Sequence, residues 1–444
     1  MNGPGARTAT SRRPLSSAQA AAGATPRVGQ PSPLILFGAF DRHNLGDLLL
    51  GRIAAELAAR LLPGRELRFA GLAVRDLRAD GGARVEALAE LAAEWKPPRR
   101  DTPPPGLLQV GGEILDCSAW QAAVMLQPPG QAQALIAYLG PRARQRDDWV
   151  RRMTGGALAP YVASPLRLPG LARTAFAGVG GVGLAQVPDA MRSEVLAALR
   201  AASFVSVRDR VTRATLADAG IAAHLLPDPA VRVADLFGHE IRQRAGTGEV
   251  AALRAAFPAG YLALQLGPEF ADDTCLDALA AQLQATLATT GIGLALFRAG
   301  LAPWHDDPAT LPRLASRLPG WPLRIMESAR LWDICALIAT SRACIASSLH
   351  ARIVATAFAR PRLSLVPAGG SGQSRKLLTY LECWEPSGPS ACVEPAGLAA
   401  ALSHALAADA GALRRQAQGL AADCRAGLEG LTGAGGFGGP DREA

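Results

Sequence analysis

Histidine, arginine and aspartate side chains stand together in two short segments of this 444-residue sequence. His350 lies in the run Ser-Ser-Leu-His-Ala-Arg, and Arg208 and Asp209 lie in Ser-Val-Arg-Asp-Arg-Val-Thr. Histidine can act as a general acid near neutral pH, and the planar guanidinium group of arginine binds carboxylates and phosphates through two parallel hydrogen bonds. These residue types therefore allow proton transfer at a bound anion. A structural histidine and a surface Arg208–Asp209 ion pair are the alternatives.

Two glycine-containing turns could bring the backbone close to such a ligand. Asn44, Gly46 and Asp47 follow an apolar run and precede a helical pattern, and the free amides at the start of a helix favour an anion. Gly111 and Gly112 follow another apolar run, where residues without a side chain admit a close approach. The alternative is that both turns only shape the chain, with Asp47 capping the helix.

Three further segments carry weaker signals. Lys376 lies in a glycine-containing entry to a helix, and Asp228 and Pro229 form a stiff acidic turn. Residues 178–183 match the G-x-G-x-x-G fingerprint of dinucleotide-binding proteins, and Asp209 follows the next apolar run. A nicotinamide or flavin enzyme is therefore an alternative at this stage.

The elements that must position these residues alternate between strand and helix, which predicts parallel α/β sheets. We expect strands at 34–40, 107–110, 174–179, 204–207, 261–266, 293–297, 323–326, 343–346 and 362–366. Helices are expected at 48–62, 189–202 and 353–358. The predicted fold is α/β, with two Rossmann-like, doubly wound domains facing a cleft. In such sheets ligands bind beyond the carboxyl ends of the strands, where the segments above lie.

The predicted domain organisation has four parts. Residues 1–30 form a disordered tail, because they contain no apolar period. The first Rossmann-like domain covers 31–240 and the second covers 250–390, with a polar segment between them. Residues 391–444 form a helical segment and a frayed tail.

Composition excludes several functional classes. The net charge of +8 comes almost entirely from arginines spread along the chain, and aromatic residues make up 5%, which argues against nucleic-acid binding. The seven cysteines never fall in a C-x-x-C spacing, so we expect free thiols and no metal site. No apolar run reaches the length of about 20 residues that a membrane helix needs. These features predict a soluble protein that is not secreted.

Taken in order, the segments resemble the motifs of the polysaccharide pyruvyl transferase family. That family has an N-x-G-D loop, a Gly-Gly turn, an R-D-x-x-S segment, a D-P turn, an R-L-H-A segment and a late lysine. The matching residues here are Asn44-Leu45-Gly46-Asp47, Gly111-Gly112, Arg208-Asp209-Arg210-Val211-Thr212, Asp228-Pro229, Ser348-Leu349-His350-Ala351 and Lys376.

Two positions depart from the family pattern. Thr212 stands where the family has serine and keeps the hydroxyl group, which could cap the following helix. Ser348 stands where the family has arginine, so a cation is lost unless Arg352, one helical turn further on, replaces it.

The resemblance implies a GT-B-like architecture and transfer of a pyruvyl group from phosphoenolpyruvate to sugar hydroxyls of a surface polysaccharide or its lipid-linked precursor. Phosphoenolpyruvate would be a co-substrate, and no cofactor is expected. We assign His350 to proton transfer or phosphate binding, Arg208 and Arg352 to the anions of the donor, and Asp47 to the role of base. The remaining candidates for ligand binding are Asn44, Gly46, Gly111, Gly112 and Lys376.

Two other functions fit the same segments. A nucleotide-sugar-dependent glycosyltransferase would share the two-domain architecture and an arginine-containing cleft. A non-catalytic, glycan-binding descendant of the family is the third possibility, because Ser348 removes a cation. The expected location is the cytoplasm, with peripheral association at the inner face of the membrane.

Overall fold

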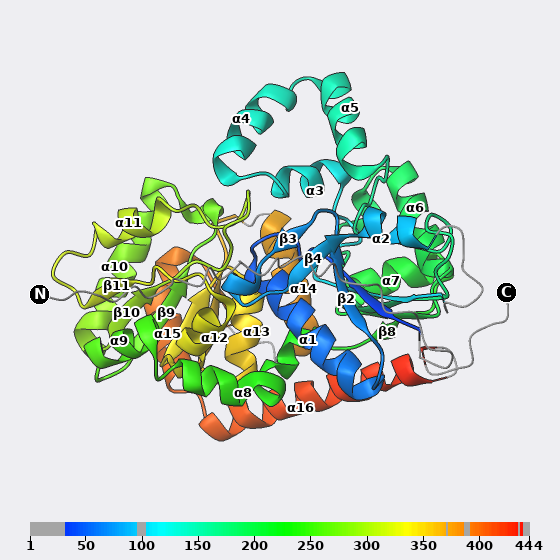
Figure 1. Cartoon of the computed structure of the whole chain (residues 1–444). Helices are drawn as coiled ribbons and strands as arrows, with labels where there is room; N and C mark the ends of the chain where they lie inside the picture. The colour runs from blue at the N-terminus through cyan, green and yellow to red at the C-terminus, as the bar shows by residue number, and fades with distance from the viewer. Residues whose placement is uncertain (1–31, 96–103, 370–371, 386–390, 434–435, 438–444) are drawn as a thin grey trace, which may run out of the picture. The chain divides into compact units, whose positions relative to one another are not determined.

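Two sheets organise the chain (Figure 1). Their strands are β1 (Leu34–Phe37), β2 (Leu67–Gly71), β3 (Arg75–Asp76), β4 (Arg84–Ala87), β5 (Gly106–Val110), β6 (Arg173–Val179), β7 (Phe204–Val207), β8 (His224–Leu225), β9 (Tyr261–Gln265), β10 (Gly293–Leu296), β11 (Leu323–Ile325), β12 (Ala343–Ala346), β13 (Arg362–Leu365) and β14 (Cys392–Val393). The computed structural model describes residues 32–95, 104–369, 372–385, 391–433 and 436–437. The predicted tail at residues 1–30 lies outside these ranges.

The strand order confirms the predicted parallel α/β class. The first sheet runs β3-β4-β2-β1-β5-β6-β7-β8, and its β3–β4 pair is antiparallel while the other pairs are parallel. The second sheet runs β11-β10-β9-β12-β13-β14, with parallel pairing throughout. Nine of these strands lie where the apolar runs predicted them.

Helices connect the parallel strands, as the geometry of parallel pairing requires. They are α1 (Leu45–Leu61), α2 (Leu88–Glu94), α3 (Ala119–Met125), α4 (Pro129–Leu139), α5 (Ala143–Thr154), α6 (Asp189–Arg200), α7 (Arg210–Asp218), α8 (Val233–Arg244), α9 (Gly248–Ala256), α10 (Asp273–Thr290), α11 (Thr310–Ala315), α12 (Leu331–Thr340), α13 (Leu349–Ala357), α14 (Gly372–Trp384), α15 (Leu398–Leu406) and α16 (Ala410–Leu428). The predicted helices at 48–62, 189–202 and 353–358 correspond to α1, α6 and α13.

The strand order reverses beside one central strand in each sheet. β1 lies between β2 and β5, and β9 lies between β10 and β12. Where the order reverses, consecutive connections leave toward opposite faces and open a crevice at the carboxyl ends of the strands. The loops after β1, β5 and β12 lead to Asn44, Gly111 and His350. The predicted site residues therefore stand at the reversal points of both sheets.

One hydrophobic core is common to the two sheets. Successive side chains of a strand point to opposite faces, so Leu34 of β1 and Tyr261 of β9 share one core while their neighbours Ile35 and Leu262 enter two separate cores. Helices α1, α8, α12, α13 and α16 contribute buried residues to the shared core. The described residues accordingly form a single compact unit.

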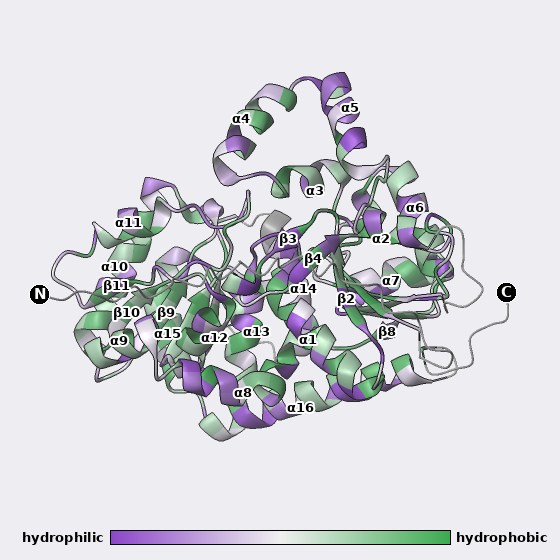
Figure 2. Cartoon of the chain, viewed as in Figure 1, coloured by the Kyte–Doolittle hydropathy of each residue, from purple (hydrophilic) through white to green (hydrophobic). Residues whose placement is uncertain are grey.

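Helices α3, α4 and α5 occupy the segment between β5 and β6. Trp120 of α3 lies 5.8 Å from Trp149 of α5 and 6.5 Å from Trp304, measured between ring centroids. Helix α5 buries no side chain, and Figure 2 shows it as largely hydrophilic. The described part of the chain has no single helix long and apolar enough to span a bilayer; only the segments Pro395–Leu406 and Ala410–Thr432, bent by 93°, meet that criterion together.

A buried ion cluster ties α13 and β13 to the end of α14. Both oxygens of Glu385 accept hydrogen bonds from Arg352, at 2.9 and 2.8 Å, and Arg362 donates to the same carboxylate at 2.8 Å. All three side chains are almost fully buried. Burial opposes ionisation of Glu385, but the two guanidinium groups dominate and lower its pKa to about 2.

We predict that Glu385→Gln destabilises the protein strongly, because it leaves two buried guanidinium groups without a carboxylate. Breaking a buried ion pair from one side costs about 3–5 kcal/mol. The contribution of Glu385 is present above its ordinary pKa near 4.5 and is lost as the pH falls toward 2. Urea unfolding at pH 7 measures the decrease in the free energy of unfolding that Glu385→Gln causes. Glu56→Gln is the control, because it breaks the exposed Arg60–Glu56 pair and should change the free energy of unfolding by less than about 1 kcal/mol. Equal effects of the two substitutions would contradict the prediction.

Candidate active site

A cavity of about 460 Å³ lies between the strand ends of the two sheets. It is lined by loops that follow β1, β5, β7, β9, β10 and β12 and by the start of α14. Six of the predicted site residues line it: Asn44, Asp47, Gly112, Arg208, His350 and Lys376. The segments 44–47, 111–113 and 347–350, which are far apart in the sequence, therefore meet at one place.

His350 packs directly against the start of α1. A Cβ atom on Gly46 would overlap the imidazole ring, so only glycine allows this contact. The same loop is joined to the second sheet through the amide of Leu45, which donates to the carbonyl of Ala299 at 2.7 Å, and through a β-bridge between Asn44 and Gly300. Gly46 therefore allows the loop after β1 to pack directly against His350. Gly111, by contrast, is not among the residues that line the cavity.

Arg208 is buried and holds two carboxylates. Its Nη1 donates to Asp228 at 2.8 Å and its Nη2 donates to Glu113 at 2.6 Å. The alternative prediction, a surface ion pair between Arg208 and Asp209, is therefore wrong. Asp209 instead caps α7 by accepting from the amide of Thr212 at 2.7 Å, so the expectation that Thr212 is the cap is also wrong.

Asp228 has no exposed surface and lies between Arg208 and His350. Its Oδ2 is 3.5 Å from Nε2 of His350, and its Oδ1 accepts from the amide of Ala230 at 2.9 Å. Burial opposes its ionisation, but His350 and Arg208 outweigh burial and lower the pKa of Asp228 far below its usual range. Asp228 is thus a negative charge behind the site, which orients Arg208 and His350.

The glycine run at 178–183 does not form a dinucleotide site. Its amides are taken by side chains: Gly181 donates to Thr212 at 3.1 Å, Val182 to Glu113 at 2.5 Å, and Gly183 to Asp116 at 2.7 Å. Only a single 3-10 turn, Leu184–Gln186, follows the run directly, and the α-helix α6 starts at Asp189. A pyrophosphate would have to displace two carboxylates, and the nicotinamide or flavin alternative loses its basis.

Asp47 lines the cavity as one half of an ion pair. Its Oδ2 accepts from Nε of Arg42 at 2.8 Å and from Nδ2 of Asn44 at 3.0 Å. Burial opposes ionisation, but Arg42 and Asn44 prevail and lower the pKa of Asp47. A carboxylate held in its ionised form in this way is a weak base. Asp47 also does not cap α1, because the N-cap residue is Asn44, whose side chain makes no capping bond.

Arg352 does not supply the missing cation. Its guanidinium points into the buried cluster with Glu385, and it does not line the cavity. The proposed replacement therefore fails because a buried carboxylate already binds this arginine. Ser348 occupies the family's arginine position as the N-cap of α13, where its hydroxyl accepts from the amide of Ala351 at 3.4 Å.

Three ionisable groups of the cavity, Asp116, Asp306 and His305, were not predicted from the sequence. Burial and the neighbouring charge of Glu113 raise the pKa of Asp116 to about 7, and burial raises that of Asp306 to about 7 although it accepts a hydrogen bond from Gln265. Burial and the charge of Arg42 lower the pKa of His305 to about 4. Asp116 and Asp306 can therefore carry a proton near neutral pH, whereas His305 is neutral. Their positions in loops after β5 and β10 were the signal that could have identified them.

Lys376 brings an ammonium group to the cavity from α14. Its side chain is exposed, and the chain segment before it includes residues 370–371, which lie outside the described ranges. Across the cavity, its charge acts to lower the pKa of Glu269, which burial raises overall. Lys376 is thus the cavity cation with the most open side chain, since Arg42 and Arg208 are buried in ion pairs.

We predict that Gly46→Ala damages the site, because the added methyl group meets the ring of His350. Overpacking of this kind typically costs about 1–3 kcal/mol. Urea unfolding and the activity assay described below measure the effect. Gly419→Ala in α16 is the matched control, since a Cβ there meets nothing within 4 Å and alanine favours a helix. A fully stable and active Gly46→Ala protein would contradict the assigned contact.

A second prediction concerns the raised pKa of Asp116. Between the ordinary pKa near 4 and the raised value of about 7, the folded protein holds a proton that the unfolded chain has lost. This contribution to stability is present at low pH and disappears as the pH rises through 7. We therefore expect the melting temperature of the wild type to fall more steeply between pH 5 and pH 8 than that of Asp116→Asn. Parallel pH profiles for the two proteins would rule out the assignment.

Comparison with known proteins gives the fold and the family resemblance. No curated protein matches the sequence. The UDP-GlcNAc 2-epimerase from Neisseria meningitidis bound to UDP-GlcNAc is 9% identical, with a TM-score of 0.51 over 90% of this chain and 99% of that chain. A further UDP-N-acetylglucosamine 2-epimerase is 11% identical, with a TM-score of 0.53 over 91% of this chain and 95% of that chain. The enzyme of Methanocaldococcus jannaschii is 11% identical, with a TM-score of 0.50 over 85% and 91%.

At these identities the likeness concerns the fold alone, and it confirms two doubly wound α/β domains in a GT-B-like arrangement. The family comparison covers the part of the chain that contains Arg208, Asp228 and His350. Residues 177–367 match the model of the polysaccharide pyruvyl transferase family, which confirms the resemblance predicted from the motifs.

Proposed function

We propose that this protein transfers a pyruvyl group from phosphoenolpyruvate to sugar hydroxyls of a surface polysaccharide or of its lipid-linked precursor. The observation that carries the proposal is the meeting of Gly112, Arg208 and His350 at one wall of the cavity, with Gly46 and Asp228 in contact with His350 behind that wall. A Cβ on Gly112 would lie 3.3 Å from Arg208 and 3.6 Å from His350, so both side chains lie directly against the glycine turn. The family match over residues 177–367 supports the transferase class.

Phosphoenolpyruvate would bind where cationic groups and hydrogen-bond donors face the cavity. Phosphoenolpyruvate carries a carboxylate and a phosphate, which require fixed positive groups. Lys376 offers an open ammonium group and His350 can bind or protonate a phosphate oxygen, whereas Arg208 is already paired with two carboxylates. Lys376 and His350 are therefore the residues that we assign to direct donor contact.

The reaction needs one proton donor and one proton acceptor. A proton adds to the methylene carbon of phosphoenolpyruvate, and a sugar hydroxyl adds to the central carbon and gives up its proton. The bond from the central carbon to the phosphate oxygen then breaks, a second hydroxyl closes the ketal, and the proton of that hydroxyl leaves with the inorganic phosphate. Asp306 and Asp116, whose pKa values lie at about 7, suit these transfers better than Asp47, because a group near neutrality can both give and take a proton.

We propose the cofactor use, the binding partners and the location of the protein as follows. The protein would use no cofactor, with phosphoenolpyruvate as co-substrate, and would bind no nucleic acid. It would work in the cytoplasm, at the inner face of the membrane, where lipid-linked sugars are assembled. The net charge of +8 would favour contact with anionic lipids there.

A glycan-binding protein without transfer activity is the second candidate function, and one observation favours it. The family arginine is replaced by Ser348, and the guanidinium groups of Arg42 and Arg208 are already neutralised by Asp47, Asp228 and Glu113. The paired carboxylates of such a cavity can accept hydrogen bonds from the hydroxyl groups of a neutral sugar. A nucleotide-sugar-dependent glycosyltransferase has no comparable support beyond the fold.

Thermal-shift profiling separates these functions, because a ligand that binds the folded state raises its apparent stability. We predict that phosphoenolpyruvate raises the melting temperature of the wild type and that Lys376→Ala abolishes the shift. UDP-GlcNAc is the comparison ligand. A shift with UDP-GlcNAc alone would support the glycosyltransferase, and a shift with neutral glycan alone would support the binding protein.

We further predict that His350→Gln reduces pyruvyl transfer by about 100-fold or more, the usual contribution of a proton-transferring side chain. Mass spectrometry of the acceptor, which detects the added pyruvyl mass, measures the loss. Arg208→Ala should also lose activity, but it leaves Asp228 buried without its partner, so its folding must be checked by urea unfolding. The exposed Arg324→Ala on β11 is the control that should retain full activity. Undiminished transfer by a folded His350→Gln protein would reject the role of His350.

A further inference from the structure

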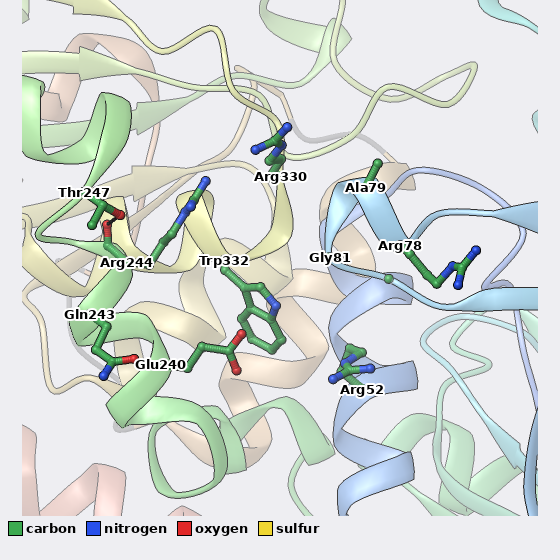
Figure 3. Close-up of a pocket in the computed structure, with 11 residues that line it drawn as sticks. Arg52, Arg78, Ala79, Gly81, Glu240, Gln243, Arg244, Thr247, Arg330 and Trp332 are labelled. Carbon is green, nitrogen blue, oxygen red and sulfur yellow. Dashed lines mark hydrogen bonds between the residues drawn. The ribbon is translucent and has the colours of Figure 1, made fainter. Parts of the chain in front are cut away.

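A second cavity, of about 600 Å³, lies away from the motif residues and is shown in Figure 3. Its walls come from four elements: α1, the turn between β3 and β4, the end of α8, and the start of α12. Four arginines line it: Arg52, Arg78, Arg244 and Arg330. Since α1 and the β3–β4 turn belong to the first sheet and α12 to the second, this cavity also lies between the two halves of the fold.

Two of the four guanidinium groups are available for a ligand. Arg78 pairs with Asp76, and Arg244 pairs with Asp333. Within the described ranges, Arg52 and Arg330 have no carboxylate in ion-pair contact, and Nε of Arg52 is buried without a hydrogen-bond partner. The one acidic residue in the lining is Glu240, so the cavity wall carries a positive excess.

Trp332 stands between these two arginines. In Figure 3 its indole lies in the middle of the cavity, with Arg330 on one side and Arg52 across from it, while Arg78 points away. Phe237 packs against the indole, with ring centroids 4.9 Å apart. A half-buried indole offers a rigid apolar face for a sugar ring, and guanidinium groups bind carboxylate or phosphate. Together they fit a sugar that carries a negative charge.

Specific contacts hold the backbone on both sides of Trp332. Gly81 has a φ of 87°, in the left-handed region that favours glycine, and a Cβ there would lie 2.9 Å from Cβ of Leu331. On the other side, Glu249 accepts from the amides of Glu327 and Ser328 at 2.7 and 2.8 Å, which fixes the turn before α12. These contacts fix the backbone on both sides of Trp332.

The second cavity is a close neighbour of the active site. Arg52 follows Asp47 by five residues on α1, which corresponds to about 7.5 Å along the helix axis. Nε2 of His43, next to the active-site residue Asn44, lies 2.9 Å from the carbonyl oxygen of Ala329, the residue before Arg330. The two cavities thus lie beside the same part of α1 and the loop before it.

We propose that this second cavity binds an anionic sugar residue of the acceptor glycan, with its carboxylate or phosphate held by Arg52 and Arg330 and its ring stacked on Trp332. The identification of the ligand as part of the acceptor rests on the proposed pyruvyl transfer. The preference for an anionic sugar rests only on the cavity itself. The two statements can therefore be tested separately.

Isothermal titration of the full chain with three probes tests the preference. The probes are a glucuronic-acid-containing oligosaccharide, the same oligosaccharide with its carboxylates reduced, and glucose 1-phosphate. We expect an anionic probe to bind, and the uronate and phosphate arms show which anion the cavity takes. The Arg52→Ala/Arg330→Ala double variant and Trp332→Ala should each weaken binding at least 10-fold, whereas Arg324→Ala should not change it. Equal binding of the reduced oligosaccharide, unchanged affinity of the double variant, or no binding of either anion would overturn the proposal.

The phosphoenolpyruvate thermal shift distinguishes failure of this site from failure of the proposed function. The double variant should keep the wild-type shift with phosphoenolpyruvate and raise only the KM for a polymeric anionic acceptor. Loss of that shift in the double variant would contradict a separate acceptor site. Anionic sugar binding by a wild type that shows no shift with phosphoenolpyruvate would support the sugar site and reject its role in pyruvyl transfer.

Discussion

Asp228 carries a negative charge at a position with no exposed surface, and its neighbours are arranged around that charge. A buried carboxylate is strongly unfavourable unless it is paired and hydrogen-bonded, so Arg208, His350 and the amide of Ala230 must stay close to it. Arg208 in turn needs a second carboxylate for its other edge and takes Glu113 from the loop after β5. One buried charge thus connects loops from both sheets and sets where the imidazole of His350 can lie.

The shared core makes this arrangement possible. In a protein whose two sheets had separate cores, the facing strand ends could move apart, and a contact as tight as that between Gly46 and His350 would open. Here α1, α8, α12, α13 and α16 pack into one core beneath both sheets. The fit at the cavity is therefore maintained by apolar burial in the core that the two sheets share. The buried Arg352–Glu385 cluster adds polar contacts to the same region.

The sequence was sufficient for the strands that are buried on both faces, because continuous apolar runs are typical of parallel strands. It did not reveal β2 and β4, whose residues are partly polar, since Arg68 of β2 pairs with Glu86 of β4 at 2.6 Å. The motif residues near the cavity were predictable from their place after strands. The partner of Arg352 was not, because Glu385 lies 33 residues further along the chain and only the fold brings them together.

Lys376 gives the cavity an unusual chemical identity. The sequence contains one other lysine, Lys96, whereas arginine supplies the rest of the cationic side chains. Reagents that acylate primary amines leave guanidinium groups untouched, because arginine stays protonated at every pH that a folded protein tolerates. An amine-directed fluorophore or crosslinker can therefore be attached at the mouth of the cavity in the unmodified protein, with Lys96 as the one other lysine side chain that reacts. Protection of the Lys376 amine by a bound molecule, measured by peptide mapping, would report occupancy directly, without a labelling cysteine or any other engineered residue.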